Sequence, residues 1–86
     1  MASGDERAHA PEELTGEGLR IGVVRARWNA EIVERLAQGV DRGLAALGVT
    51  DIVVQSVPGS FEIPFAAKAL AASDTVDAVI CIGCVI

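Results

Sequence analysis

The sequence predicts an α/β fold: a β-α-β-α-β chain that forms part of a three-layer αβα sandwich with a parallel sheet. Three short, largely apolar segments alternate with two longer segments of helical character. Alternation of this kind is typical of a parallel sheet that is covered by helices on both faces. Right-handed crossovers then bring the carboxyl ends of all three strands to one edge, where ligands of open α/β sheets bind.

The three strands are expected at residues 19–24, 51–57 and 77–82, where apolar side chains predominate. Nearly continuous apolar runs are typical of strands that are covered on both faces. The chain stops at Ile86, directly after the third strand, which would leave a sheet with two open edges. We therefore expect residues 19–86 to be a truncated portion of a longer domain.

The first helix is expected between Asn29 and Gly48. Asn29 is suited to accept hydrogen bonds from the first amides of a helix, and Gly48 is suited to the position after the last turn. Gly39 and Gly43 lower helix propensity, and we interpret them as sites of close packing against a neighbouring element. One apolar face recurs through the segment: Ile32, Val33, Leu36, Ala37, Val40, Leu44 and Leu47.

The second helix follows the Pro58-Gly59 break and is expected to begin with Ser60 as its cap. Pro64 fits the first turn, because an early helical position needs no amide donor. The helix is expected to run to about Ala72. A turn at Ser73-Asp74-Thr75 then leads into the third strand.

Charge separates a tail from the remainder of the chain. Residues 1–18 carry five acids and one base, a net charge of −4, whereas residues 19–86 carry seven acids and six bases, a net charge of −1. We therefore expect a flexible acidic tail at residues 1–18 and the α/β domain at residues 19–86. His9 lies in this tail, where we expect it to be solvated.

Composition excludes several classes of partner. The chain has no basic stripe, so it is not expected to bind nucleic acid. No apolar run approaches the roughly 20 residues of a membrane-spanning helix. Hydrophobic residues make up 51% of the chain, so much apolar surface is expected to be buried in a larger structure or against partners. Neither a G-x-G-x-x-G motif nor a Walker motif is present, which argues against dinucleotide-binding and P-loop folds.

Trp28 is the only tryptophan, and it lies between the first strand and Asn29, at the predicted ligand edge. Its flat ring is able to stack on a planar heterocycle. The alternative is a hydrophobic contact at the junction of strand and helix. Trp28 taken alone favours this alternative.

The segment Val57–Pro64 has the most unusual composition at this edge. The start of a helix offers free amides to ligand oxygen atoms, Ser60 adds a hydroxyl, and Glu62 is able to accept from polyol hydroxyls or ring N–H groups. The alternative is an ordinary Pro-Gly turn with a serine cap, which leaves Phe61 beside a carboxylate unexplained. The residues alone leave the two interpretations about equal.

Cys81 and Cys84 form a C-x-x-C pair in one apolar segment. A thiol redox protein or half of a metal site is one interpretation, but redox pairs usually open a helix, and the sequence holds no second pair of zinc ligands. Two buried small side chains are therefore favoured. The pair also indicates a reducing compartment without a disulfide framework, and we expect the cytoplasm.

Three segments at this edge resemble the lumazine synthase family: Arg27-Trp28-Asn29, Val57–Pro64, and Asp77–Ile80 leading into Ile82–Ile86. Their order and spacing are those of the family, so residues 19–86 resemble the first half of its flavodoxin-like domain. The resemblance implies a transferase of riboflavin biosynthesis that condenses 5-amino-6-(D-ribitylamino)uracil with 3,4-dihydroxy-2-butanone 4-phosphate to 6,7-dimethyl-8-ribityllumazine. It implies no metal and no organic cofactor.

The resemblance also implies roles in binding the ribitylaminouracil. Trp28 matches the aromatic residue that stacks on the pyrimidinedione, and Asn29 would lie near the ribityl side. Three residues match the stretch that holds the ribityl chain and the ring: Ser60, Phe61 and Glu62. Three more match the strand-end segment whose backbone reads the pyrimidine edge: Cys84, Val85 and Ile86.

The resemblance implies no catalytic residue within this chain. The phosphate loop, the proton-transferring His and a later Arg from a neighbouring subunit are expected beyond Ile86, so the chain alone is predicted to have negligible synthase activity. The family forms pentamers and sometimes shells of twelve pentamers, and a homo-oligomer of this kind is implied. The alternative is a non-catalytic fragment that binds heterocycles or takes part in assembly.

Overall fold

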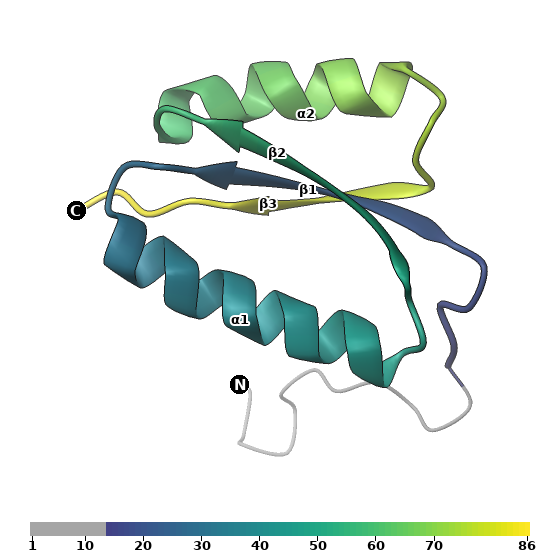
Figure 1. The fold of residues 1–86 in the computed structure, drawn as a ribbon. Helices are drawn as coiled ribbons and strands as arrows, with labels where there is room; N and C mark the ends of the chain where they lie inside the picture. The colour runs from purple at the N-terminus through teal and green to yellow at the C-terminus, as the bar shows by residue number, and fades with distance from the viewer. Residues whose placement is uncertain (1–13) are drawn as a thin grey trace, which may run out of the picture.

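The computed structural model describes residues 14–86 and contains a three-stranded sheet (Figure 1). The elements are β1 (Arg20–Ala26), α1 (Ala30–Ala46), β2 (Asp51–Val57), the short 3-10 turn η2 (Ser60–Glu62), α2 (Ile63–Ala72) and β3 (Ala78–Ile82). β1 lies in the middle and is parallel to both β2 and β3. The predicted β-α-β-α-β fold is confirmed. Most of the tail expected at residues 1–18, including His9, lies outside the described residues.

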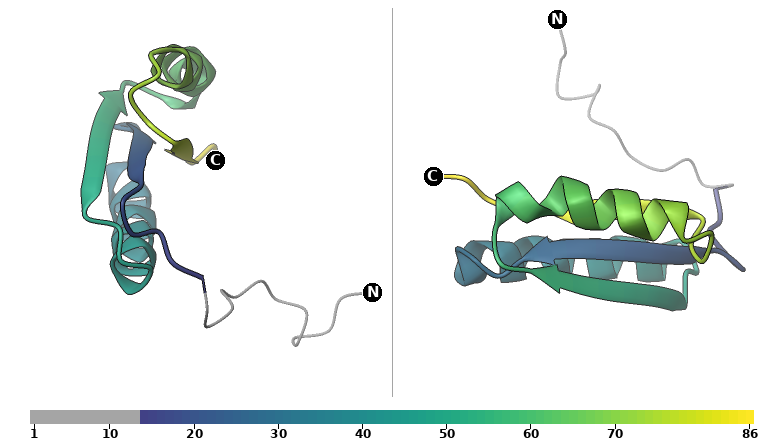
Figure 2. Two further views of the ribbon diagram at one scale, coloured as in Figure 1. Left: turned by 90° about the vertical axis from the view of Figure 1, so that its right-hand side faces the viewer. Right: turned by 90° about the horizontal axis from the view of Figure 1, so that it is seen from above.

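The two helices cover opposite faces of the sheet (Figures 1 and 2). α1 packs on the face that carries Ile21 and Val23 of β1, and Val33 of α1 is fully buried there. α2 lies on the other face, where Gly22 of β1 faces it and Val24, two positions on, is fully buried. Both faces of β1 are therefore covered, as its continuous apolar run predicts.

The carboxyl ends of the three strands lie together, on the left of Figure 1 beside the C-terminus. α1 and α2 both begin at this edge, so the loops after β1 and β2 are short and lie next to each other. The predicted meeting of the three strand ends at one edge is confirmed, and this edge is called the ligand edge below. Within the described part of the chain, no helix combines the length and the apolar character needed to cross a membrane.

The boundaries of the first and third strands differ from prediction by one or two residues. β1 extends to Ala26, because Arg25 and Ala26 continue the parallel pairing with β2. β3 begins one residue later than predicted, at Ala78, because Asp77 uses its side chain as well as its backbone to bond Arg20. The Asp77 amide donates to the Arg20 carbonyl at 2.8 Å, and the Asp77 carboxylate accepts from the Arg20 amide at 2.8 Å. These two bonds tie the chain at the edge opposite the ligand edge.

The buried face of α1 is narrower than predicted. Five of the expected residues contact the core: Val33, Ala37, Val40, Leu44 and Leu47. Ile32 and Leu36 are instead 41% and 47% exposed. Each of them precedes a buried residue by one position and is therefore rotated by about 100° around the helix axis. They flank the buried stripe rather than belonging to it.

Roles were predicted for three glycines in and after α1, and the structure confirms the role of Gly48 only. Gly48 follows the helix with φ of 82°, in the left-handed region expected of it. The predicted close packing of Gly39 and Gly43 is wrong in this chain. A Cβ at Gly43 would meet nothing within 4 Å, and one at Gly39 would approach only the Arg42 guanidinium at 3.7 Å. Both glycines are exposed, because they lie on the face of α1 that the sheet does not cover.

Gly22 is a point of close contact between β1 and α2. A Cβ there would lie 2.5 Å from Cδ2 of Leu70 and 3.4 Å from Cγ1 of Val76. We expect Gly22→Ala to lower the free energy of unfolding by about 1–3 kcal/mol, because the Leu70 side chain, or α2 with it, must move. Gly43→Ala is the control and should raise it by about 1 kcal/mol through helix propensity. Urea unfolding measures both changes, and a Gly22→Ala variant that is as stable as the unsubstituted chain would contradict close packing at Gly22.

Arg25 links β1 to α1 through an ion pair with Glu34, in which Nη2 and Oε1 are 2.8 Å apart. The hydrogen bond from Arg25, and then its positive charge, hold the pKa of Glu34 below its ordinary value. A lowered pKa in the folded state stabilises the fold above the ordinary pKa, and this contribution is lost as the pH falls through the lowered value.

We therefore expect acidification from about pH 5 to about pH 3 to reduce the stability of the unsubstituted chain more than that of Glu34→Gln, which has no carboxylate to protonate. The difference will be small, because the pair is partly solvent-exposed. Thermal unfolding at a series of pH values measures it. Parallel pH profiles for the two chains would show that the ion pair contributes nothing.

Candidate functional site

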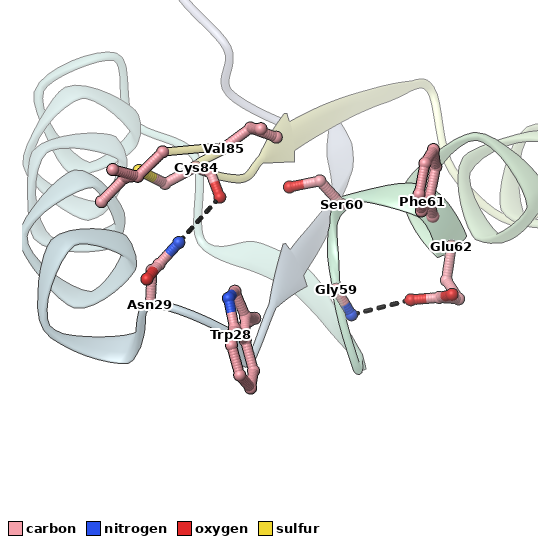
Figure 3. A pocket seen from close by; sticks show the side chains of 9 residues that line it. Trp28, Asn29, Gly59, Ser60, Phe61, Glu62, Cys84 and Val85 are labelled. Atoms are coloured by element: carbon pink, nitrogen blue, oxygen red, sulfur yellow. Dashed lines mark hydrogen bonds between the residues drawn. The ribbon is translucent and has the colours of Figure 1, made fainter.

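Three strand-end segments converge on a pocket of about 500 Å³ at the ligand edge (Figure 3). Nine residues line it: Trp28, Asn29, Gly59, Ser60, Phe61, Glu62, Cys84, Val85 and Ile86. This set contains every residue that the sequence predicts as a binding residue and adds Gly59. The fold thus brings the predicted residues together, while their roles in binding stay predictions.

Backbone hydrogen bonds join the first two loops beyond the end of the sheet. The Arg27 amide donates to the Val57 carbonyl at 2.8 Å, and the Trp28 amide donates to the Pro58 carbonyl at 2.9 Å. These bonds continue the pairing of β1 with β2. The backbone of Trp28 is therefore held beside the turn that follows β2.

Trp28 presents its ring to solvent, with 71% of the residue exposed. A ring that packed at the junction of strand and helix would be largely buried, so the exposure does not support the alternative of a hydrophobic contact. An exposed indole at a pocket wall offers a flat apolar face to a planar ligand.

Asn29 precedes α1 as predicted, but its predicted capping role is wrong. Its backbone lies in the left-handed region, with φ of 59° and ψ of 47°, and its side chain makes no capping hydrogen bond. A capping side chain normally starts from an extended backbone, which Asn29 does not have. Its Nδ2 instead donates to the carbonyl oxygen of Cys84, 3.1 Å away (Figure 3). The side chain thus connects the loop after β1 to the segment after β3.

The loop after β2 turns through η2 before α2 begins. The Glu62 amide donates to the Gly59 carbonyl at 3.2 Å, and the Gly59 amide donates to Oε1 of Glu62 at 2.8 Å. This reciprocal pair closes the turn, so the predicted cap from Ser60 is wrong, and the Ser60 side chain makes no capping bond. Its hydroxyl points toward the Cys84 side of the pocket (Figure 3). Pro64 occupies the first turn of α2, as predicted.

Gly83 shapes the pocket without lining it, and sequence reasoning did not assign it this role. A Cβ there would lie 2.7 Å from Oγ of Ser60 and 2.7 Å from Cδ1 of Ile63. Glycine therefore lets the segment after β3 pass close to η2. The available signal was its place at the end of an apolar strand, where glycine often marks the close approach of another segment.

Apolar side chains around the pocket remain exposed. Phe61 is 97% exposed, Val85 is 85% exposed and Ile86 is 92% exposed. Exposed apolar side chains of this size around one pocket are typical of a surface that meets a ligand or another protein. The described residues therefore leave the outer wall of the pocket open.

The prediction that both cysteines are buried is wrong. Cys81 is exposed and Cys84 is partly buried, and both are free thiols. Cys81 lies on β3, an edge strand of the sheet, whereas Cys84 packs against the core. Within residues 14–86, no group of three or more His, Cys, Asp or Glu side chains is arranged to hold a metal ion.

Comparison with known families shows to which family the chain belongs. The sequence model of the 6,7-dimethyl-8-ribityllumazine synthase family matches residues 18–86, which is most of the chain. The chain belongs to this family. The resemblance seen in the three strand-end segments is confirmed, and in this member of the lumazine synthase family residues from each of those segments line one pocket.

Curated relatives carry the name of the family. The 6,7-dimethyl-8-ribityllumazine synthase of Kineococcus radiotolerans is 49% identical over 78 residues, which cover 90% of this chain and 48% of the relative. That of Methylibium petroleiphilum is 49% identical over 76 residues, or 86% of this chain and 48% of the relative. That of Pyricularia oryzae is 52% identical over 62 residues, which cover 70% of this chain and 31% of the relative. The chain thus spans about half the length of the first two relatives.

Proposed function

We propose that this chain provides the ribitylaminouracil half of the active site of a lumazine synthase, a transferase of riboflavin biosynthesis. Such an enzyme condenses 5-amino-6-(D-ribitylamino)uracil with 3,4-dihydroxy-2-butanone 4-phosphate to 6,7-dimethyl-8-ribityllumazine. The observation that carries the proposal is the pocket itself, because residues from each of the three segments that resemble the family line it together.

The chemistry of the pocket suits this ligand. A pyrimidinedione is flat and is able to stack on the exposed indole of Trp28. The ribityl chain carries hydroxyls, for which Ser60 offers a hydroxyl and Glu62 a carboxylate. The N–H and C=O groups of the ring suit the backbone of residues 84–86, and Phe61 adds an apolar contact.

The half-site is proposed to bind without catalysing. No histidine occurs in residues 14–86, and we assign no catalytic residue among them. Proton transfer by a positioned group typically contributes about 10²–10⁴-fold to a rate. The 86-residue chain alone is therefore expected to bind the uracil substrate without appreciable turnover.

Family membership also supports a proposal for the setting of this site. We propose a domain at residues 19–86 that assembles into a homo-oligomer, a pentamer or a shell of twelve pentamers, in the cytoplasm. The exposed apolar residues Phe61, Val85 and Ile86 support a site that is completed by a neighbouring subunit. The two free thiols support a reducing compartment.

Titration of the chain with ribitylaminouracil, followed by the fluorescence of Trp28, tests the proposal. Saturable quenching is expected, with no lumazine formed when both substrates are supplied. Uracil without the ribityl chain is the control ligand and should bind more weakly, because it lacks the hydroxyls that face Ser60 and Glu62. Turnover at a normal enzymatic rate would overturn the half-site proposal, and the absence of saturable quenching would favour a fragment that serves assembly only.

A further inference from the structure

We propose that Asn29 is a positioning residue, whose side-chain amide holds the segment Cys84–Ile86 in place as the third wall of the pocket. Asn29 acts through this segment rather than on the ligand. Its effect on ligand affinity rests on the proposed function, whereas its effect on the segment does not.

The segment after β3 has left the sheet. The last pair of the β1–β3 ladder joins Arg25 and Ile82. Neither Val85 nor Ile86 is packed, because they are 85% and 92% exposed. Strand pairing and apolar contacts therefore do little to fix the end of this segment.

The bond from Asn29 Nδ2 to the Cys84 carbonyl supplies the missing connection. In the described part of the chain, it is the one hydrogen bond that the structure shows between residues 27–29 and residues 83–86. It is partly buried and joins residues 55 positions apart. Because a trans peptide directs its C=O and N–H in opposite directions, holding the Cys84 carbonyl also sets the direction of the Val85 amide.

Asparagine meets two requirements at this position. The backbone of Asn29 has φ of 59°, a conformation that asparagine adopts more readily than most residues other than glycine. Since a carbonyl oxygen only accepts hydrogen bonds, the side chain must present its NH2 group to Cys84. Aspartate keeps the shape without a donor, and glycine keeps the backbone conformation without a side chain. The two substitutions therefore separate the hydrogen bond from the backbone.

Nuclear magnetic resonance of the nitrogen-labelled chain without ligand tests the positioning role directly. Asn29 is the only asparagine, and the only glutamines are Gln38 and Gln55, so three pairs of side-chain NH2 signals are expected, and Asn29→Asp identifies the pair from Asn29. Its NH2 protons should exchange with water several-fold more slowly than those of the two exposed glutamines. Equally fast exchange of all three would overturn the proposal.

The same spectra report on the segment itself. Asn29→Asp and Asn29→Gly should both shift the backbone amide signals of Val85 and Ile86. Ser56→Ala is the matched control, since it removes the hydrogen bond from Arg27 at the same edge of the sheet and should leave those signals in place. Unchanged Val85 and Ile86 signals in both Asn29 variants would overturn the positioning role, even if the variants fold normally.

Calorimetric titration with ribitylaminouracil supplies the second measurement. Both Asn29 variants are expected to bind roughly three- to tenfold more weakly than the unsubstituted chain, and Ser56→Ala should bind equally well. Unweakened binding by both Asn29 variants would overturn the inference while leaving the proposed function standing. If the unsubstituted chain does not bind, the proposed function fails, and the spectra without ligand decide the positioning role by themselves.

Discussion

Trp28→Ala is expected to weaken the binding of ribitylaminouracil about tenfold to a hundredfold. The indole is 71% exposed at a wall of the pocket, so its removal should leave the fold intact and take away the face on which the pyrimidinedione is proposed to stack. Stacking of a base on an aromatic side chain is worth about 1–3 kcal/mol, and about 1.4 kcal/mol corresponds to a factor of ten in affinity. Calorimetry measures the change, because the substitution removes the fluorescent reporter.

Two further substitutions at Trp28 separate stacking from apolar volume. Trp28→Phe keeps a flat π-face and should recover most of the affinity. Trp28→Leu keeps apolar volume only and should bind about as weakly as the alanine variant. The unfolding midpoint is expected to stay the same in all three variants, since the ring is largely exposed. Equal affinity of Trp28→Ala and the unsubstituted chain would rule out a stacking role.

Val33→Asp is expected to remove most of the stability of the fold. Val33 is fully buried between α1 and the sheet, and no polar or charged residue is buried within residues 14–86 to receive a carboxylate. An unpaired charge in such a place is expected to lower the free energy of unfolding by about 4 kcal/mol or more. Small domains have a total stability of only about 5–15 kcal/mol. Loss of helical circular dichroism, or a greatly lowered urea midpoint, measures the effect.

Ile32→Asp is the matched control for this prediction. Ile32 is the preceding residue in the first turn of α1 and is 41% exposed. The helix dipole favours a negative charge in the first turn at either position, so the two variants differ mainly in the burial of the charge. We expect Ile32→Asp to lower stability by about 1 kcal/mol. Comparable destabilisation by the two variants would contradict the observed burial pattern of α1.

Much of the fold could be predicted because the signals for it are local. Three apolar segments, the break at Pro58-Gly59 and the glycine at Gly48 predict the order of elements and most of their boundaries. The apolar period of α1 also predicts one buried face. It does not decide between adjacent stripes of the helix. Ile32 and Leu36 have the same apolar character as the buried residues, and only the packing of α1 on the sheet shows that they are exposed.

For the site, the sequence predicted which residues meet but not all of their hydrogen bonds and exposure. Residues from each of the three segments that resemble the family do meet at one pocket, because right-handed crossovers between parallel strands bring the strand ends to one edge. Hydrogen-bond partners and exposure were predicted less well. The cap assigned to Ser60 is replaced by a pair between Gly59 and Glu62, and Cys81 is exposed on an edge strand instead of buried.

The sequence by itself determined which segments form strands and helices and at which edge their loops meet. Apolar periods and turn residues act over a few positions, and right-handed crossovers between parallel strands then bring the strand ends to one edge. Only the tertiary structure decided which side chains bond to which partners. Asn29 carries the local signal of a helix cap, yet its amide bonds to a carbonyl 55 positions away. That choice depends on how closely β1 and β3 bring their ends together, and no pattern within a few residues encodes such a distance.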